Sequence, residues 1–391
     1  MRQVVVASAC RTPIGSFQGA LSSLTAPQLG SFVIREAVNR AGISPRQVEE
    51  VFMGCVLTAG VGQAPARQAA IFGGIPSSVP CTTINKVCGS GLKSVMLGAL
   101  TIMAGEADVV VAGGMESMSN APYLLDKART GYKLGDGKIV DSMVKDGLWD
   151  VYNNFHMGSA AELCARECNI PREAQDEFAA MSYRRALEAA DRGYFKDEIV
   201  PVQVKAKDGT TIAIEQDEEP RKVKFEKMVQ LKPAFEKEGT VTAANASKLN
   251  DGSATVVLMA EETARKLKIE PIARILSQAS FAHAPEWFTT APVSLIQNLL
   301  KKSGLNKEEI DLFEINEAFA VVALATIQML DLDIEKVNIH GGAVALGHPI
   351  GASGARILTT LIYAMQRKGS HKGLAAICIG GGEAAGIIIE R

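Results

Sequence analysis

Apolar residues along this chain gather into short runs that predict buried β-strands. The runs cover residues 4–8, 50–57, 107–114, 254–260, 271–277 and 374–382. Between these runs the apolar residues recur at helical spacing, so helices are expected to alternate with the strands. Continuous apolar strands that alternate with helices are typical of parallel or mixed sheets covered on both faces. The pattern therefore predicts an α/β fold.

The apolar pattern also repeats along the chain. Helical positions behind Gly89 have apolar counterparts 262 positions later, and the same shift carries residues 41–42 onto 303–304. The matched positions are Val95, Met96, Ala99, Leu100 and Met103 with Ile357, Leu358, Leu361, Ile362 and Met365, and also Val48 with Ile310. Several matches in the same order indicate an internal duplication. We therefore predict two duplicated α/β halves.

A long stretch between the two halves has a different composition. Residues 119–246 carry most of the tyrosines, and the run 215–227 within them is dense in charge. Such a run is usually a solvated loop, although its basic part suits contact with phosphates. The strand-like run 254–260 then resumes the first half. We predict a first half of 1–118 plus 247–269, an inserted loop domain of 119–246 and a second half of 270–391.

Charge and hydropathy exclude several classes of protein. The 391 residues include 41 Lys and Arg against 43 Asp and Glu, so no general basic field attracts nucleic acid. By inspection, no apolar run reaches the ~18–20 residues that cross a bilayer, and we expect no membrane partner. The N-terminal residues lack the features of a signal peptide, which favours the cytoplasm, although a processed organellar protein would look the same.

The cysteines give no sign of a disulfide framework or a metal site. Their number is odd and they are widely scattered, at positions 10, 55, 81, 88, 164, 168 and 378, without a Cys-x-x-Cys pair. Cys164 and Cys168 share a helix face, but no nearby histidine completes a ligand set, so helix packing is the simpler interpretation. We expect reduced thiols and no bound metal.

One cysteine stands at a position suited to chemistry. Cys88 lies between a strand-like run and a helical run, followed by Gly89 and Gly91. A buried core thiol would explain it alone. The duplication, however, places Cys88 and the segment 347–354 at equivalent strand-to-helix corners, so His348 is expected to face Cys88. A thiol beside a base and a helix N-terminus is the arrangement that produces a nucleophilic thiolate.

Two further positions lie at predicted strand ends. Cys378 ends a buried strand and precedes three glycines, whose main-chain N–H groups are free to point at an oxyanion. Asn316 occupies the slot that Gly54 has in the first half, where its amide could hold a water molecule. The competing interpretations are a core cysteine and a structural turn cap. Both positions belong to the edge of the sheet where ligands bind in such folds.

Five motifs now connect these residues to a family. They are NKVCGSGLKS at 85–94, GGMESMS at 113–119, NEAFA at 316–320, GGAVALGHPIGASGAR at 341–356 and CIGGGEAAG at 378–386. Together, in this order and across essentially the whole chain, they resemble the thiolases. The resemblance implies the thiolase fold, in which two α/β halves pack as a five-layer αβαβα sandwich with a large inserted loop domain.

The resemblance also implies a reaction and the roles of its residues. Thiolases catalyse the reversible Claisen condensation of two acyl-CoA molecules, and the reverse thiolysis. By motif, Cys88 is acylated while His348 accepts its proton, and Cys378 moves the α-proton of the second acetyl-CoA. His348 with a water on Asn316 would form one oxyanion hole, and the N–H groups of Cys88 and Gly380 the other. CoA thioesters are the substrates, and no cofactor or metal is required.

Two loops resemble the pantetheine-binding loops of short-chain, acetoacetyl-CoA-type members. They are 148–162 and 231–253, and they imply that His156 and Ser247 contact the thioester end of CoA. The other implied contacts are Leu148, Met157 and Phe319, which form an apolar slot, with Phe235 and Ala243 beside the pantetheine and Arg221 near the CoA phosphates. Taken alone, His156 is explained equally well as a core histidine whose ring nitrogens are hydrogen-bonded. Bulky side chains in the slot favour acyl groups of two to four carbons.

Four functions are compared on this basis. The favoured one is an acetyl-CoA C-acetyltransferase, which makes acetoacetyl-CoA and CoA from two acetyl-CoA; the second is a broader 3-ketoacyl-CoA thiolase of β-oxidation. A condensing enzyme acting on acyl-carrier protein is disfavoured, because those enzymes pair one Cys with two His. A non-catalytic CoA-binding protein is disfavoured by the intact Cys88, His348 and Cys378. The family commonly forms dimers or dimers of dimers, so a homo-oligomer is expected, and Glu383 remains without a role.

Overall fold

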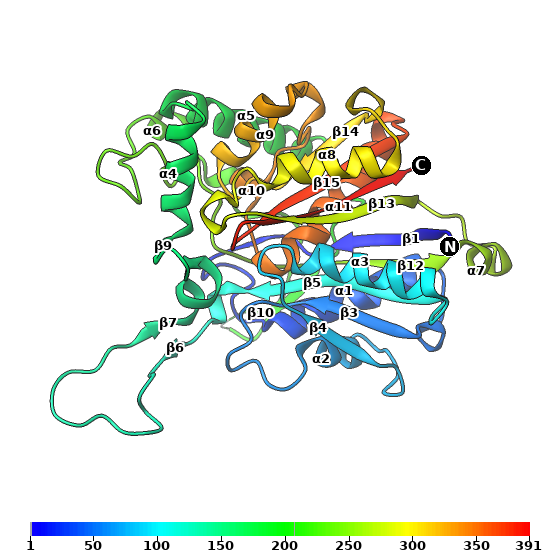
Figure 1. The fold of residues 1–391 in the computed structure, drawn as a ribbon. Helices are drawn as coiled ribbons and strands as arrows, with labels where there is room; N and C mark the ends of the chain where they lie inside the picture. Colours follow the sequence, from blue (N-terminus) through cyan, green and yellow to red (C-terminus); the bar gives the residue numbers. More distant parts are fainter. Residues whose placement is uncertain (1, 207) are drawn as a thin grey trace.

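A mixed ten-stranded sheet forms the centre of the computed structural model, which describes residues 2–206 and 208–391. Its path is β14-β15-β16-β13-β1-β12-β5-β3-β4, with β2 beside β12 (Figure 1). The strands are β1 (Val4–Arg11), β2 (Gly15–Ser16), β3 (Glu50–Gly54), β4 (Cys81–Ile84), β5 (Val109–Ser117), β12 (Asn250–Ala260), β13 (Ala273–Ala282), β14 (Leu312–Ile315), β15 (Lys372–Ile379) and β16 (Glu383–Glu390). All six predicted strands are present, and the α/β prediction is confirmed.

The sheet is nearly symmetric about its middle. Strands β1, β12, β5 and β3 follow one another on one side, and β13, β16, β15 and β14 follow in the corresponding order on the other. The two series join at β1 and β13 through the pairs Val5–Arg274 and Val6–Ala273. Short 3-10 turns at Pro45–Gln47 and Lys307–Glu309 precede β3 and β14 at the predicted offset. The duplicated halves are therefore confirmed in three dimensions.

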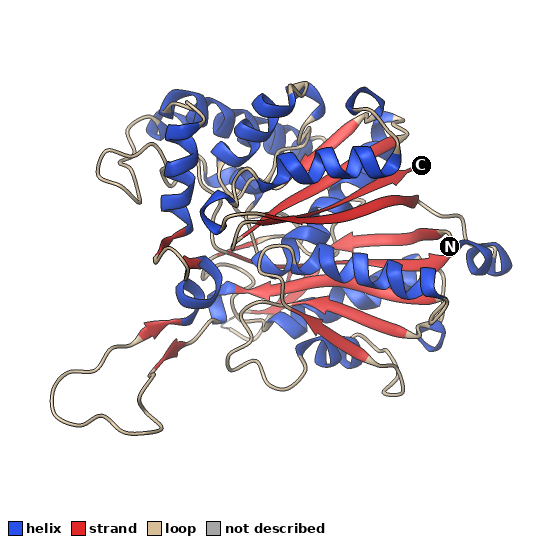
Figure 2. Cartoon of the chain, viewed as in Figure 1, coloured by secondary structure: helices blue, strands red, loops and turns tan. Residues whose placement is uncertain are grey.

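Helices complete five layers around these strands. They are α1 (Ala26–Arg40), α2 (Pro65–Phe72), α3 (Ser90–Ala104), α7 (Glu261–Leu267), α8 (Ala291–Ser303), α9 (Ala320–Leu330), α10 (Ala343–Leu346) and α11 (Ile350–Lys368). Helices α3 and α11 contact each other, and α11 contacts β5 and β12 of the first half as well as β14 and β15 of the second. Helices α1 and α2 cover the outer face of the first half, and α8 covers that of the second (Figures 1 and 2). The αβαβα sandwich is confirmed.

The central helix corrects one conclusion drawn from hydropathy. Val87–Ala104 is an 18-residue stretch with a mean hydropathy of 1.5, so one described helix is long and apolar enough to cross a membrane, contrary to our inspection of the sequence. In the fold residues 90–104 of this stretch form α3, with Leu92, Val95 and Ala99 fully buried among core residues of both halves. A helix packed on several sides is apolar around most of its circumference. Burial within the sandwich thus explains its hydropathy.

The chain between β5 and β12 forms a lobe of two helices, of 11 and 20 residues, and several shorter elements. It contains β6 (Tyr123–Leu124), β7 (Val140–Asp141), a π-helical turn (Val144–Leu148), β8 (Trp149–Asp150), β9 (Phe155–His156), α4 (Met157–Glu167), α5 (Arg172–Asp191), β10 (Val202–Lys205), β11 (Thr211–Ile214), a 3-10 turn (Pro220–Lys222) and α6 (Phe225–Met228). The predicted boundaries of the inserted domain and of the two halves remain predictions. The segment between β6 and β7 projects from the body of the molecule (Figure 1).

A buried ion cluster ties this lobe to the first half. The guanidinium of Arg11 on β1 bonds to Glu198 at 2.6 Å and to Asp217 at 2.7 and 2.9 Å. Arg11 and Glu198 are almost completely excluded from solvent. Breaking one partner of such a pair leaves a buried charge without compensation. The cluster therefore fixes the lobe that carries the predicted pantetheine loops against the sheet.

Candidate active site

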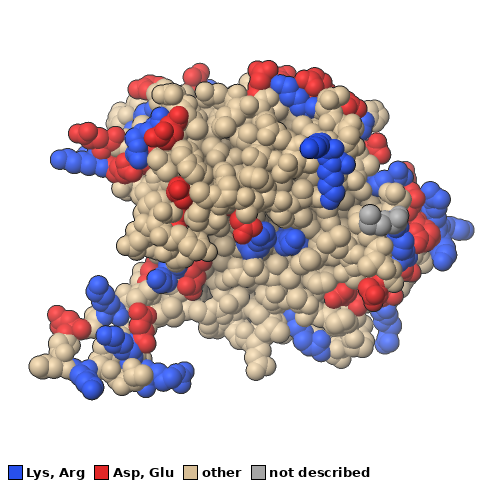
Figure 3. Space-filling model, viewed as in Figure 1, with Lys and Arg blue, Asp and Glu red and all other residues tan. Residues whose placement is uncertain are grey.

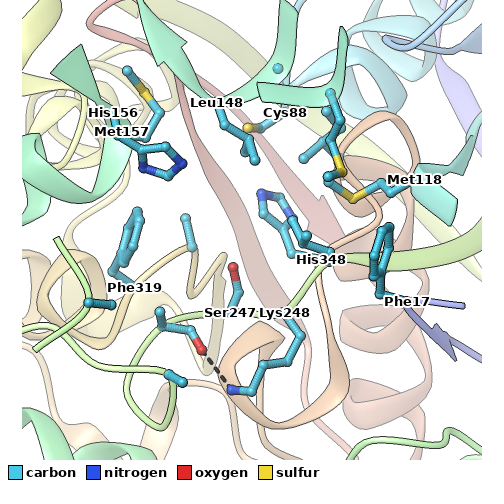
Figure 4. Close-up of a pocket in the computed structure, with 18 of the residues that line it drawn as sticks. Phe17, Cys88, Met118, Leu148, His156, Met157, Ser247, Lys248, Phe319 and His348 are labelled. Atoms are coloured by element: carbon cyan, nitrogen blue, oxygen red, sulfur yellow. Dashed lines mark hydrogen bonds between the residues drawn. The ribbon is translucent and has the colours of Figure 1, made fainter. Parts of the chain in front are cut away.

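A cavity of about 590 Å³ lies where the two halves and the lobe meet. Its wall is largely apolar, and the predicted site residues on it are Cys88, Leu148, His156, Met157, Phe235, Ala243, Ser247, Phe319, His348 and Gly380. Figure 4 shows Cys88 and His348 on one side of the cavity and His156, Met157 and Phe319 on the other. Such a site, apolar with a few convergent polar groups, is typical of ligand binding.

The corner between β4 and α3 presents Cys88. Ser90, the first residue of α3, closes this corner because its hydroxyl accepts from the N–H of Lys86 at 2.8 Å and donates to the carbonyl of Val87 at 2.6 Å. Val87 has a φ of 44°, which is a strained conformation for a β-branched residue. Strained backbone of this kind is common where a side chain must be aimed at a ligand.

Glycines allow the corner that carries Cys88 to approach the corner that carries His348. A Cβ atom on Gly91 would lie 2.9 Å from the nitrogen of Ala355 and 3.0 Å from the oxygen of Gly351. A Cβ atom on Gly114 would lie 2.0 Å from that same oxygen. The distances of 2.9 and 2.0 Å are too short for a real Cβ contact, so α3, α11 and β5 meet here backbone to backbone. The thiol and the imidazole are thereby brought to one wall.

His348 is held in a defined tautomer. Its Nδ1 lies 2.6 Å from Oγ of Ser353, and that hydroxyl lies 3.0 Å from the carbonyl of Pro349. Because the hydroxyl has a single proton and donates it to Pro349, its oxygen accepts from Nδ1–H. Nε2 then carries the lone pair, and it has no partner among the residues that the structure describes. The basic nitrogen of His348 is free.

The protonation states of Cys88 and His348 suit a proton transfer. Burial raises the pKa of the Cys88 thiol to about 11, opposed by the N–H groups of Gly380 and of Cys88 itself. Burial, together with the nearby Arg356, lowers the pKa of His348 to about 3. At neutral pH the pair is therefore a thiol and a neutral imidazole. The imidazole can accept the proton only as the thiol attacks.

Cys378 lies directly behind the cavity wall. It is next to last in β15, it is 1% exposed, and it packs in the cluster that contains Met157 and Phe319. Burial and the neighbouring charge of Cys88 raise the pKa of its thiol well above the usual value, opposed by N–H groups that include that of Ala318. The structure thus brings the two predicted cysteines close enough that a charge on Cys88 raises the pKa of Cys378. Cys378 is a thiol at rest.

Asn316 follows β14, as predicted, and is completely buried. Its N–H bonds to the carbonyl of Ala376 at 2.9 Å. Neither Nδ2 nor Oδ1 of its side chain has a protein partner in the described part of the chain. A buried amide of this kind normally bonds to an ordered water. Asn316 is outside the first wall of the cavity, which agrees with an action through water.

His156 and Phe235 form the opposite wall. His156 caps α4, and its Nδ1 accepts from the N–H of Gly158 at 3.0 Å, which places the ring proton on Nε2. Its ring stacks on Phe235 with centroids 4.8 Å apart, and Phe235 meets Phe319 edge-on at 6.0 Å. Ser247 is fixed by a bond from its N–H to the carbonyl of Ala318 at 3.0 Å. These loops form an apolar part of the cavity wall, on which the Nε2–H of His156 is a donor.

Arg221 is the one predicted contact that the structure turns away from this cavity. Its guanidinium bonds to Asp191 at the end of α5 at 2.7 Å, and it lines a smaller neighbouring cavity with Lys196 and Asp217. The next residue, Lys222, lies on the main cavity instead. The 3-10 turn separates the two side chains, because successive residues on such a turn point about 120° apart. The contact of Arg221 with the CoA phosphates remains a prediction.

Four residues around the site were not identified from the sequence. Ser353 orients His348, and Oδ1 of Asn250 accepts from the N–H of His348 at 2.9 Å. The buried carboxylate of Glu116 accepts from the N–H groups of Val56, Leu57 and Gly351, at 2.9–3.2 Å. Lys248 lies on the cavity wall beside Ser247. The position of Ser353 one turn into α11 was the available signal, whereas Asn250 and Glu116 needed the tertiary fold.

Glu383, which had no role in the sequence, forms an ion pair with Lys86. Lys86 precedes Cys88 by two residues, and Glu383 begins β16 directly after the glycines at 380–382. The pair joins the corner that carries the thiol to the loop that carries the N–H of Gly380.

Within residues 2–206 and 208–391, no group of three or more His, Cys, Asp or Glu side chains could hold a metal ion.

Comparison with known proteins agrees with this geometry. The family model for the thiolase N-terminal domain matches residues 4–262, and that for the thiolase C-terminal domain matches residues 269–391. The acetyl-CoA acetyltransferase of Cupriavidus necator is 53% identical over 392 residues, covering 100% of both chains. The mitochondrial acetyl-CoA acetyltransferase of Homo sapiens is 51% identical, covering 100% of this chain and 91% of that protein.

A solved structure shows the same fold. The crystal structure of the Bacillus anthracis acetyl-CoA acetyltransferase superposes with a TM-score of 0.98 at 43% identity, covering 100% of this chain and 99% of that chain. Both family models together span nearly every described residue. The chain therefore belongs to the thiolase family.

Proposed function

We propose that this thiolase is an acetyl-CoA C-acetyltransferase, which condenses two acetyl-CoA to acetoacetyl-CoA and CoA and catalyses the reverse thiolysis. The observation that carries the proposal is the placement of Cys88 and His348 on one apolar cavity, with the free Nε2 of His348 on that wall. The relatives named above, which match over the full length of this chain, support the choice of acetyl groups. The slot of aromatic and aliphatic side chains supports short acyl groups.

The first half-reaction transfers an acetyl group to Cys88. Sγ of Cys88 attacks the thioester carbonyl of acetyl-CoA while Nε2 of His348 takes the thiol proton. The carbonyl carbon then releases the sulfur of CoA, which takes the proton back from His348. The N–H groups of Gly380 and Cys88, which already act on the sulfur of Cys88, are suitably placed to stabilise the oxyanion.

The second half-reaction forms or breaks the carbon–carbon bond. In thiolysis the Cys378 thiol protonates the departing acetyl carbon, which suits its raised pKa. Condensation is the reverse of these steps. Cys378 first passes its proton to Nε2 of His348, and the resulting thiolate takes an α-proton from the second acetyl-CoA. The carbanion attacks the carbonyl of the acetyl-Cys88 thioester and displaces Sγ, which takes the proton from His348. His348 and a water held by Asn316 stabilise the enolate. Formation of the enolate is the step that needs the most electrostatic stabilisation.

The wall of the cavity sets the length of the acyl group. His156 and Phe235 are stacked, and Phe319 and Phe288 meet at 6.3 Å, so packed rings form part of the wall of the slot, beside Leu148 and Met157. Rotation of such packed rings to admit a long alkyl chain would disrupt their mutual contacts. Thiolysis of acetoacetyl-CoA is therefore favoured over thiolysis of a ten-carbon 3-ketoacyl-CoA.

A steady-state assay tests the proposal. Purified protein is mixed with CoA and with 3-ketoacyl-CoA of four, six or ten carbons, and loss of the 3-ketoacyl thioester is followed. We expect a kcat/KM for the four-carbon substrate at least about tenfold above that for the ten-carbon one. Equal values would favour the broader 3-ketoacyl-CoA thiolase, and no turnover of any substrate would contradict both functions.

We also infer that the chain works as a homo-oligomer, as a dimer of dimers. The projecting segment between β6 and β7 exposes Leu125, Leu134 and Ile139, of which Leu134 is fully exposed. Figure 3 shows charges interspersed along this projection and few charges over the middle of the visible face. Leu100 on α3 and Phe72 at the end of α2 are about half-exposed as well. Exposed apolar groups of this kind are typical of subunit contacts.

Sedimentation of the full chain, compared with a variant lacking 126–138, tests this assembly.

A further inference from the structure

Lys248 is a partly buried lysine on the wall of the active-site cavity. Its Nζ donates to the carbonyl of Ala246 at 2.8 Å and to the carbonyl of Val344 at 3.3 Å. It also lies 5.6 Å from the centre of the Tyr183 ring. Figure 4 shows the amine turned away from Cys88 and bonded to a main-chain oxygen of its own loop. The amine of Lys248 therefore bonds to the main chain and does not point at the reacting atoms.

The two carbonyls belong to different parts of the site. Ala246 and Ser247 lie on the predicted pantetheine loop, where the N–H of Ser247 is bonded to Ala318 at 3.0 Å. Val344 lies in α10, the four-residue helix that ends two residues before His348. The ammonium of Lys248 thus connects the loop that receives the substrate to the turn that carries the base.

The carbonyl of Val344 depends on this lysine. In a continuing helix it would accept from the N–H four residues on, which belongs to His348. That N–H instead donates to Oδ1 of Asn250 at 2.9 Å. The carbonyl is therefore left at a helix C-terminus, where a cation is favoured both as donor and by the helix dipole. Lys248 supplies that cation.

The remaining neighbours place charge on both sides of the same turn. Glu317 accepts from the N–H of Val344 at 3.1 Å and from the hydroxyl of Ser182 at 2.7 Å. Burial lowers the pKa of Lys248 to about 8, while Glu219 and Glu317 act to raise it. One peptide unit of the turn is thus held by a carboxylate, and the carbonyl of Val344 by an ammonium. Such opposed bonds restrict the turn more strongly than packing alone.

We propose that Lys248 is a positioning residue for His348, whose ammonium fixes the turn at Val344 so that Nε2 faces the thiol of Cys88. The inference rests on the proposed function in that it treats His348 as the base for Cys88. Loss of the ammonium would leave the carbonyl of Val344 unsatisfied and allow the turn to shift. A small displacement of a base is expected to affect the rate of acylation more than the binding of acetyl-CoA.

The test compares two Lys→Met variants of the full-length protein. Lys248→Met removes the proposed contact. Lys307→Met is the matched control, since Nζ of Lys307 also donates to two main-chain carbonyls at a helix end, those of Leu330 and Asp331 at 2.9 and 2.7 Å. None of these three residues lines the cavity. Steady-state thiolysis of acetoacetyl-CoA gives kcat and KM. Alkylation of Cys88 by iodoacetamide as a function of pH reports on its base without using turnover.

For Lys248→Met we expect kcat to fall by about 10-fold or more, KM to stay within about threefold, and the alkylation profile to move to higher pH. Lys307→Met should keep the kcat and the alkylation profile of the parent protein. Equal kcat values and superimposable profiles for the two variants would overturn the inference. If Lys248→Met does not fold, Lys248→Gln, which keeps an amide donor without the charge, is measured against the same two criteria. A parent protein that alkylates normally but turns over no acyl-CoA would refute the proposed function instead.

Discussion

Nδ1 of His348 lies 2.6 Å from Oγ of Ser353, within the first turn of the helix that follows the histidine. This contact determines which ring nitrogen carries the proton. Because the Ser353 hydroxyl donates to Pro349, the only tautomer compatible with both bonds has the lone pair on Nε2, on the side of the cavity. The orientation of the base is therefore built into α11 itself.

Ser353→Ala is predicted to lower kcat by about 10-fold and to leave KM nearly unchanged. Without the hydroxyl, Nδ1–H is left buried without an acceptor, and the ring has no bond that selects its tautomer. Steady-state thiolysis of acetoacetyl-CoA measures the effect. Ser94→Ala is the control, since Ser94 is equally buried and also donates to the carbonyl four residues earlier, at 2.9 Å, but on α3. A kcat for Ser353→Ala equal to that of the control would contradict the prediction.

Cys88→Ser is predicted to abolish acylation, with activity falling by at least about 10³-fold. A hydroxyl is a far weaker nucleophile than a thiol at neutral pH, and His348, whose pKa is about 3, is too weak a base to compensate. The change in side-chain volume is small, so the free energy of unfolding should change little. Stopped-flow release of CoA from acetyl-CoA measures the first half-reaction. A normal burst of CoA from this variant would assign the nucleophile elsewhere.

Cys378→Ala is predicted to keep the first half-reaction and to lose the second. The variant should release one equivalent of CoA and retain the acetyl group on Cys88, because Cys378 acts only on the α-carbon. Acetoacetyl-CoA formation and thiolysis should both fall by about 10³-fold. Loss of the CoA burst together with condensation would show that the two cysteines do not divide the steps in this way.

The ion pair between Lys86 and Glu383 is predicted to matter for rate more than for stability. Both side chains are partly exposed, so the pair contributes no more than about 1 kcal/mol to the free energy of unfolding. It nevertheless joins the corner of Cys88 to the loop of Gly380. Glu383→Gln should therefore slow acylation by about three- to tenfold. The charge swap Lys86→Glu with Glu383→Lys should recover most of that loss, and a swap as slow as Glu383→Gln would contradict the positioning role.

Glu116 is predicted to make stability depend on pH near neutrality. Burial raises its pKa from 4.5 to about 7 in the folded chain, against the N–H bonds that favour its anion. Between these two values the folded state holds a proton that the unfolded state has released. The free energy of unfolding should therefore fall as pH rises from about 4.5 to 7, by up to about 1.4 kcal/mol per unit, and level off above that. Denaturant titrations should show a smaller slope for Glu116→Gln in this window, and identical slopes would refute the assignment.

The sequence predicted the fold wherever the apolar pattern was continuous or repeated. The six apolar runs are strands, and the offset of 262 correctly placed Cys88 and His348 just before the equivalent helices α3 and α11. The prediction of a strand-to-helix corner is wrong for His348, because the helix α10 precedes it. Strand β16 was not predicted, since its alanines and its glycine at 386 read as a continuation of the glycine-rich turn. The mean hydropathy of α3 was underestimated because polar residues interrupt its apolar run, although most of the helix is buried.

The site was predictable where a residue carries its own chemistry and not where its role depends on neighbours. Cys88 and Gly380 are recognisable beside their glycines. The direction of Arg221, by contrast, depends on Asp191 at the end of α5, which no local pattern reveals. Lys248 and Glu116 act through main-chain groups of segments distant in the sequence. Contacts of that kind are properties of the folded chain alone.

Mass spectrometry of the intact protein after mixing with acetyl-CoA, followed by mapping of the modified peptide, shows whether a thiol, an imidazole and an oxyanion-binding N–H converge on one thioester. We predict a single acetyl group, attached to Cys88, that disappears when free CoA is added. His348→Ala should acquire this group at least about 10²-fold more slowly. A protein that stays unmodified, or that carries the acetyl group on another residue, would contradict the assignment of Cys88 as the nucleophile.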